Sequence, residues 1–188
     1  MNDMQHRKTT ALLLCALFTA LIAVSAFIRI PAPLVPITLQ SGTVLLSGML
    51  LGAKTGAKSV LIYVLLGLVG VPIFTMGGGL SYVFQPTFGY LLGFIIGAYI
   101  VGVLAWKNPL PTVQYLFCSA LAGLAAIYLI GTAYCYWIST FVLGTSLAFW
   151  PLLFSCCILP LPGDLLLCML AAHIGKRLLP FTRFKIYS

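Results

Sequence analysis

The chain has 188 residues, of which 62% are hydrophobic and only 6% are charged. Soluble domains carry about 25% charged residues, so this composition excludes an ordinary soluble protein and indicates an integral membrane protein. The formal charge is +8, but the basic residues lie at the ends of apolar segments, as cytoplasmic anchors of membrane helices do. No motif or basic face supports nucleic-acid binding.

Six apolar runs predict an all-α integral membrane protein with one domain, 1–188. We expect transmembrane helices at about 10–28, 39–53, 59–71, 87–106, 113–138 and 163–179. The first run ends at Pro31 and Pro33, because closely spaced prolines rule out continued helix. Lys54 and Lys58 flank a predicted tight turn between the second and third runs. Three successive glycines, 77–79, make the stretch 72–86 irregular.

The stretch 139–161 is apolar but interrupted by Gly144, Pro151 and Pro160. With a cytoplasmic amino terminus and six spans, every basic residue except Arg29 falls on the cytoplasmic side, as membrane topology favours. A seventh span would carry the basic carboxyl terminus outside. We therefore predict a partly helical outer segment between helices 5 and 6. Both termini are then cytoplasmic in a multi-pass protein of the cell (cytoplasmic) membrane.

The three outer connections, 31–38, 72–86 and 139–161, are long and rich in proline or glycine, whereas the two cytoplasmic connections are short and basic. Elaborate loops gathered on one side of a rigid helical scaffold are typical of a binding site. The sequence therefore predicts an outward-facing pocket.

Asp164 is the only acidic side chain at membrane depth, and it lies at the outer start of the last predicted helix. A carboxylate costs roughly 2.5–3.5 kcal/mol at the centre of a membrane helix, so its presence there needs a reason. One interpretation is a helix cap, which a free amino-terminal turn favours. The other is a polar contact in the outward pocket, where the carboxylate accepts hydrogen bonds from the N–H groups of a ligand.

The sequence gives only weak support for ATP binding, metal binding or cysteine chemistry. Residues 52–59 nearly match an ATP-binding Walker A loop, but Ala57 stands where the second glycine is needed and no strand precedes it. Any ATP-driven work would therefore come from a partner. His6 and His173 are the only histidines and cannot build a multi-histidine metal site, so we expect no metal and no cofactor. Six cysteines inside apolar runs are typical of packing residues.

Two further patterns each leave two interpretations open. The vicinal pair Cys156 and Cys157 is compatible with packing or with a membrane enzyme that acts on thiols. Ala16 and Ala20 lie one turn apart on the first predicted helix, where small residues allow another helix to approach closely. That helix belongs either to the same bundle or to a partner protein.

Four segments in order resemble the BioY family, the biotin-binding S-components of energy-coupling factor (ECF) transporters. They are PLVPITLQ (33–40), GLVGVPIF (67–74), GGG (77–79) followed by PTFGYLLGF (86–94), and LPGDLL (161–166). The resemblance spans about residues 10–180. It implies six membrane helices, a biotin pocket near the outer surface, and uptake of biotin without chemical change. S-components for other vitamins, such as riboflavin, thiamine or lipoate, remain an alternative.

The resemblance also implies partners. An S-component works with a coupling membrane protein and two cytosolic ATPases, so we expect a transporter subunit without its own ATPase site rather than an enzyme. In this family, small residues on the first helix commonly dock the coupling subunit, which gives Ala16 and Ala20 that expected role.

Within the resemblance, Asp164 matches the family's aspartate and is expected to bind the polar head of biotin. The family usually has a lysine one turn later, where this chain has Leu167, and a glycine where it has Gln85. Gln85, Tyr82 and Arg29 are candidates to make the contacts of the missing lysine, and Arg29 to attract the carboxylate tail. The matching segments contribute four further expected ligand contacts, Thr38, Gln40, Phe74 and Tyr90.

Overall fold

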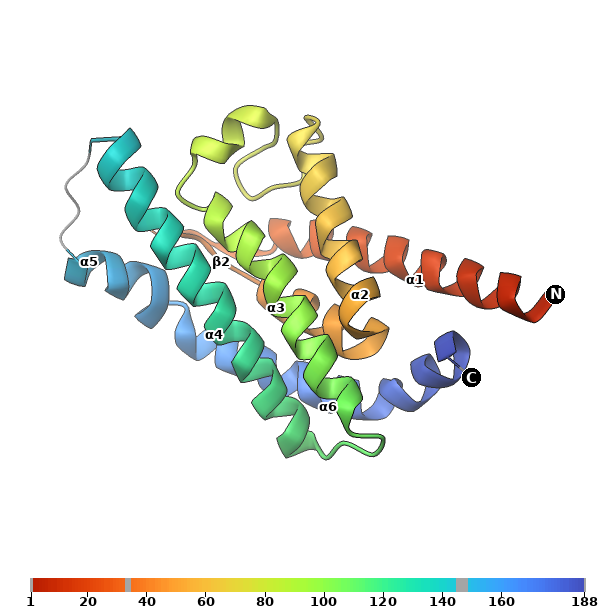
Figure 1. Ribbon diagram of the computed structural model, residues 1–188. Helices are drawn as coiled ribbons and strands as arrows, with labels where there is room; N and C mark the ends of the chain where they lie inside the picture. The colour runs from red at the N-terminus through yellow and green to blue at the C-terminus, as the bar shows by residue number, and fades with distance from the viewer. Residues whose placement is uncertain (1, 33–34, 145–148, 188) are drawn as a thin grey trace.

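The computed structural model describes residues 2–32, 35–144 and 149–187. Its main helices, shown in Figure 1, are α1 (Asn2–Phe27), α2 (Gln40–Leu68), α3 (Phe88–Lys107), α4 (Val113–Trp137), α5 (Phe149–Leu153) and α6 (Leu161–Tyr187). Pro33 and Leu34, in the first segment that resembles BioY, lie outside the described residues. So do residues 145–148 of the predicted outer segment.

Five helices among the described residues are long and apolar enough to cross a membrane. They span Arg7–Phe27, Gln40–Leu68, Phe88–Lys107, Val113–Val142 and Trp150–Thr182. The prediction of an all-helical chain with several membrane helices is therefore confirmed. The first and last helices are longer than predicted, since α1 begins at Asn2 and α6 reaches Tyr187.

Helix α2 consists of two arms that fold back on each other at Gly52. This residue has φ 78° and ψ 173°, a backbone conformation that glycine adopts readily because it lacks a Cβ. A Cβ on Gly56 would lie 2.7 Å from the Cα of Gly48, so the arms touch through their backbones. The two arms correspond to the predicted helices 39–53 and 59–71.

The predicted tight turn at Lys54–Lys58 is wrong, because these residues are helical and the chain reverses at Gly52 instead. Sequence pattern pointed to the lysines as markers of a cytoplasmic turn. The reversal, however, depends on the residue that can take a positive φ, and two charged residues one turn apart are compatible with helix.

Short elements lie in the connections between the long helices. Strands β1 (Arg29–Ile30) and β2 (Ile37–Thr38) pair antiparallel between α1 and α2, and η1 (Leu80–Phe84) is a 3₁₀ helix before α3. The described part of the predicted outer segment holds the π-helical turns η2 (Ile138–Val142) and η3 (Phe154–Ile158), with α5 between them. The hairpin was not predicted, because two-residue strands have no sequence period to detect.

The helices approach closely through glycines. A Cβ on Gly48 would lie 2.2 Å from the carbonyl oxygen of Ala98, and one on Gly102 would lie 2.3 Å from the nitrogen of Ala53. These contacts press α2 against α3, and Figure 1 shows α3 between α2 and α4. Small residues at such crossings are the usual means of packing membrane helices, since lipid provides no hydrophobic force between them.

Two groups of contacts define two ends of the bundle. At one end, Trp106 Nε1 donates to the carbonyl oxygen of Met49 at 2.8 Å, and Lys176 Nζ donates to that of Pro111 at 2.8 Å. These bonds bring together the bend of α2, the end of α3 and the middle of α6. At the other end, Tyr134 Oη donates to the carbonyl oxygen of Val83, which joins α4 to η1.

We expect Gly48→Ala to lower the free energy of unfolding by about 1–3 kcal/mol, because its Cβ would meet backbone atoms of α3 that cannot rotate away. Thermal unfolding of the purified protein in detergent measures this as a lower midpoint. Gly163→Ala is the matched control, since its nearest neighbour would lie 3.7 Å away. Equal midpoints for the two variants would contradict the backbone contact at Gly48.

Candidate ligand-binding site

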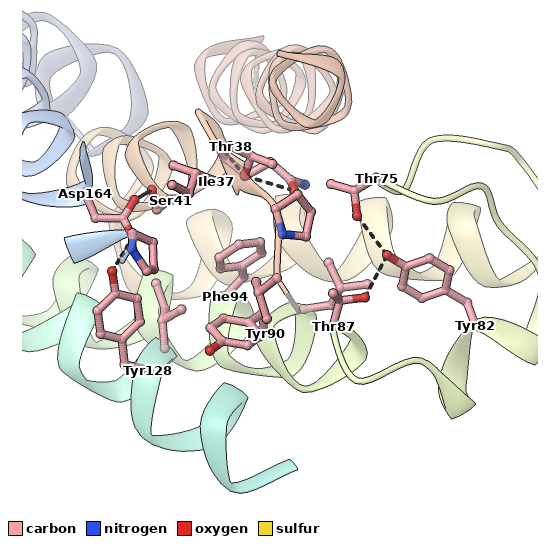
Figure 2. Close-up of a pocket in the computed structure, with 16 residues that line it drawn as sticks. Ile37, Thr38, Ser41, Thr75, Tyr82, Thr87, Tyr90, Phe94, Tyr128 and Asp164 are labelled. Carbon is pink, nitrogen blue, oxygen red and sulfur yellow. Dashed lines mark hydrogen bonds between the residues drawn. The ribbon is translucent and has the colours of Figure 1, made fainter. Parts of the chain in front are cut away.

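A cavity lies at the end of the bundle that carries η1 and the β1–β2 hairpin, and Figure 2 shows it in close-up. It is lined by residues from the α1–α2 connection, α2, the loop before α3, α3, α4 and the start of α6: Val35, Pro36, Ile37, Thr38, Gln40, Ser41, Thr75, Tyr82, Thr87, Tyr90, Leu91, Phe94, Ile127, Tyr128, Pro160 and Asp164. The space free of atoms, including its open mouth, is about 530 Å³. Little of it is wide enough for a water molecule, so the cavity is a narrow slot.

One side of the cavity holds the buried carboxylate of Asp164. Ser41 Oγ donates to Oδ1 at 2.5 Å, and Tyr128 Oη donates to Oδ2 at 2.5 Å. The two hydroxyls come from α2 and α4, so the carboxylate joins three helices (Figure 2). Asp164 is only 6% exposed, and hydrogen bonds of this kind offset the cost of burying a charge. The capping interpretation of Asp164 is not needed to explain its burial.

The opposite side of the cavity holds a cluster of hydroxyl groups. Tyr82 Oη lies 3.0 Å from Thr75 Oγ1, and it accepts a hydrogen bond from Thr87 Oγ1 at 3.0 Å. Figure 2 shows these three side chains together, away from Asp164. The ring of Phe74 packs against that of Tyr82, with the two ring centroids 4.5 Å apart. The cavity therefore has two polar sides of different chemistry, a carboxylate and a group of hydroxyls.

An apolar wall separates the two polar sides. Phe94 and Tyr90 lie one turn apart on α3 and face the cavity between Asp164 and Tyr82 (Figure 2). The hydroxyl of Tyr90 is directed away from the slot and donates to the carbonyl oxygen of Cys156 at 2.9 Å. Its ring is thus held in place as part of the wall, as rigid aromatic surfaces in ligand pockets usually are.

Five of the predicted site residues line this cavity: Asp164, Thr38, Gln40, Tyr82 and Tyr90. Gln40 Nε2 donates to Tyr63 Oη at 2.8 Å, and Tyr63 in turn donates to the carbonyl oxygen of Ile73. The amide of Gln40 thereby ties the first arm of α2 to the second. Thr38 Oγ1 accepts from the backbone N–H of Gln40, which fixes the start of the helix.

Three predicted residues lie outside the cavity lining. Phe74 is 2% exposed and packs between Tyr63 and Tyr82. Gln85 is exposed at the end of η1. Arg29 is also exposed, and its guanidinium donates to the carbonyl oxygen of Thr75, so it links the β1–β2 hairpin to the loop that carries the hydroxyl cluster.

Four polar residues of the lining were not predicted from the sequence: Ser41, Tyr128, Thr75 and Thr87. A tyrosine in the middle of an apolar helix is a usable signal, because its buried hydroxyl needs a partner, and Asp164 is the only acid at that depth. The serine and threonines gave no such signal, since small hydroxyl residues occur throughout membrane helices and often bond to the preceding turn.

Leu167, one turn after Asp164 on α6, packs against α2. A Cβ on Gly42 would lie 3.1 Å from the Cβ of Leu167, so α2 and α6 are close at this level. The half-buried leucine is not part of the cavity lining. Ser41, next to Gly42, is the α2 residue that reaches the carboxylate from this interface.

A second hollow, of about 950 Å³ with its open side, lies between α1 and the second arm of α2. Its walls are apolar: Leu12, Cys15, Ala16, Thr19, Ala20, Ala23, Ile62, Leu66, Val71 and Ile73. Ala16 and Ala20 are both exposed and lie one turn apart on its α1 side. The small residues leave a depression on the surface of the bundle.

Comparison with known proteins gives consistent matches. A sequence model described as the BioY family matches residues 1–184. A probable biotin transporter BioY from Lysinibacillus sphaericus is 46% identical over 133 residues, covering 71% of this chain and 68% of that protein. The biotin transporter BioY of Rhizobium etli is 33% identical over 185 residues, covering 90% and 92%. The biotin transporter BioY of Thermotoga maritima is 46% identical over 121 residues, covering 64% and 70%.

The fold also matches a solved structure. It is a crystal structure of the S-component for biotin from an ECF-type ABC transporter, with a TM-score of 0.79 and 27% sequence identity. The match covers 95% of this chain and 94% of that chain. The similarity in fold therefore extends over nearly the whole chain.

We expect Tyr128→Phe to destabilise the protein by about 1–3 kcal/mol, because a buried carboxylate would lose one of its two hydroxyl donors. The measurement is thermal unfolding in detergent. Tyr136→Phe is the control, since Tyr136 lies on the same helix and is 44% exposed. An unchanged midpoint for Tyr128→Phe would contradict the bond to Asp164.

Proposed function

The chain belongs to the BioY family, and from this premise we propose that it binds biotin and carries it across the cytoplasmic membrane as the substrate-binding subunit of a transporter. The observation that carries the proposal is the buried carboxylate of Asp164 on one side of a narrow, mostly apolar slot. Membership of a transporter family also argues against the alternative that Cys156 and Cys157 serve a membrane enzyme acting on thiols.

The slot matches the chemistry of biotin. The ureido ring of biotin presents two N–H donors, and a carboxylate accepts from such donors more strongly than a neutral group does. We place this ring at Asp164, where Ser41 and Tyr128 hold both carboxylate oxygens in a fixed orientation.

The rest of biotin is an apolar thioether ring and a valerate tail. Phe94 and the ring of Tyr90 form the wall on which the thioether ring would pack. The tail would then point toward the hydroxyl cluster of Thr75, Tyr82 and Thr87, whose O–H groups can donate to a carboxylate. Arg29, bonded to the carbonyl oxygen of Thr75, adds a positive charge at that side.

We further propose that the chain crosses the membrane six times, because α2 reverses at Gly52 and its two arms would each cross once. The basic residues Lys54, Lys58 and Lys107 lie at or near the bend of α2 and the end of α3, and Lys176 bonds to the α3–α4 connection. Positive charge favours the cytoplasmic side. The pocket, with η1 and the hairpin, would then face outward.

Energy for transport would come from partners, a coupling membrane protein and cytosolic ATPases. We propose that the coupling protein packs a helix into the hollow beside Ala16 and Ala20, where small side chains let two backbones approach. The proposal is supported by the position of these two small residues on an exposed side of α1, where large apolar residues surround them.

We expect Asp164→Asn to weaken biotin binding about 10- to 100-fold, since hydrogen bonds to a charged group contribute about 1.5–3 kcal/mol. Titration of the purified protein with radiolabelled biotin measures the dissociation constant. Asp3→Asn is the matched control, because Asp3 is the only other acid in the chain. Unchanged affinity of Asp164→Asn, at equal folded protein, would refute the assignment.

Competition in the same assay tests the choice of vitamin. Excess unlabelled biotin is expected to displace the label, while riboflavin, thiamine and lipoate leave it bound, because none of them presents the same pair of ureido donors. Displacement by one of these three at lower concentration than biotin would favour the alternative S-component.

We expect Ala20→Leu to retain biotin binding in detergent but to lose most biotin uptake by cells, because the added side chain fills the α1 hollow. Leu17→Phe is the control, since Leu17 is exposed on α1 outside that hollow. Uptake is measured with radiolabelled biotin at equal protein level. If uptake by Ala20→Leu matches the parent, the hollow is not the docking site.

A further inference from the structure

Two buried cysteines face each other beside the pocket. The Sγ atoms of Cys135, at the end of α4, and Cys156, in η3, lie 3.6 Å apart, although the residues are 21 positions apart in the sequence. Both side chains are fully buried. The neighbouring Cys157 is directed elsewhere, with its Sγ 3.1 Å from Thr132 Oγ1. The sulfur partner of Cys156 is therefore Cys135.

We propose that Cys135 and Cys156 form a redox-active dithiol, whose disulfide crosslinks α4 to η3 beside the ligand pocket. The two Sγ atoms are in contact at 3.6 Å and must come closer to reach the S–S bond length of about 2.05 Å. The thiol of Cys156 donates toward the Sγ of Cys135, which makes Cys135 the better nucleophile. Under the proposed orientation the pair lies on the outer side, where disulfides persist.

The reaction needs a small uncharged oxidant, and a peroxide meets that need because it can reach a buried thiol that bulky reagents cannot. The sulfur of Cys135 attacks one oxygen of hydrogen peroxide, the O–O bond breaks, and the other oxygen leaves as water with the thiol proton. The sulfur of Cys156 then attacks the resulting sulfenic acid, the S–O bond breaks, and a second water leaves. Two thiols and one peroxide thus give one disulfide and two waters.

The pair is connected to the pocket through Tyr90. The hydroxyl of Tyr90 donates to the carbonyl oxygen of Cys156 at 2.9 Å, and its ring lines the cavity. On the other side of the pair, α4 carries Tyr128, which holds Asp164. The disulfide would therefore restrain two walls of the pocket relative to each other, and a bound ligand would leave more slowly.

The first test measures the crosslink itself and does not depend on the proposed function. The full-length protein in detergent is treated with hydrogen peroxide, unfolded, labelled with maleimide and analysed by peptide mass spectrometry. We expect a Cys135–Cys156 crosslink in the parent and in Cys157→Ser, with two fewer labelled thiols, restored by dithiothreitol. Cys156→Ser should show no such loss. A Cys156–Cys157 crosslink, or no crosslink at all, would overturn the proposal.

The second test rests on the proposed function and measures release of radiolabelled biotin before and after peroxide. Release is expected to slow several-fold in the parent and in Cys157→Ser, but not in Cys156→Ser. Equal release rates for crosslinked and reduced protein would overturn the link to the pocket. If the reduced parent bound no biotin, the proposed function would fail, while the crosslink would stand on the first test.

Discussion

The arrangement of the pocket depends on one buried carboxylate and the two hydroxyls that hold it. Asp164 would be costly in an apolar bundle without partners, and Ser41 and Tyr128 provide one donor for each of its oxygens. Because the donors come from α2 and α4 and the acid from α6, the same bonds that satisfy the charge fix three helices around the slot. A polar contact that stabilises the fold thus also orients an acceptor toward the cavity.

The second constraint is the close approach of the helices through glycines. Gly52 reverses α2, and Gly48 and Gly102 bring α2 and α3 into backbone contact. The pocket lies at the other end of the bundle, where α2 and α6 begin and where η1 and the hairpin connect the helices.

The sequence predicted most of the helices and singled out Asp164, which lies in the cavity lining, because long apolar runs and a lone membrane acid are strong signals in any lipid-exposed chain. It misplaced the turn of α2, since a positive φ at Gly52 is not marked by composition. It also missed Ser41 and Thr87, whose roles come from contacts between distant segments. Thr38, Gln40 and Tyr90 were predicted through the family segments, and Tyr82 as a substitute for the missing lysine; all four line the cavity. Arg29, Phe74 and Gln85 lie outside the lining, and the contact of each predicted residue with a ligand stays a prediction.

A structure of the protein with bound biotin shows whether Asp164 holds the ureido ring. We expect a ureido nitrogen of biotin within hydrogen-bond distance of an Asp164 carboxylate oxygen, with the thioether ring on Phe94 and the tail toward Tyr82. A ureido ring at the Tyr82 side, with no contact to Asp164, would contradict it.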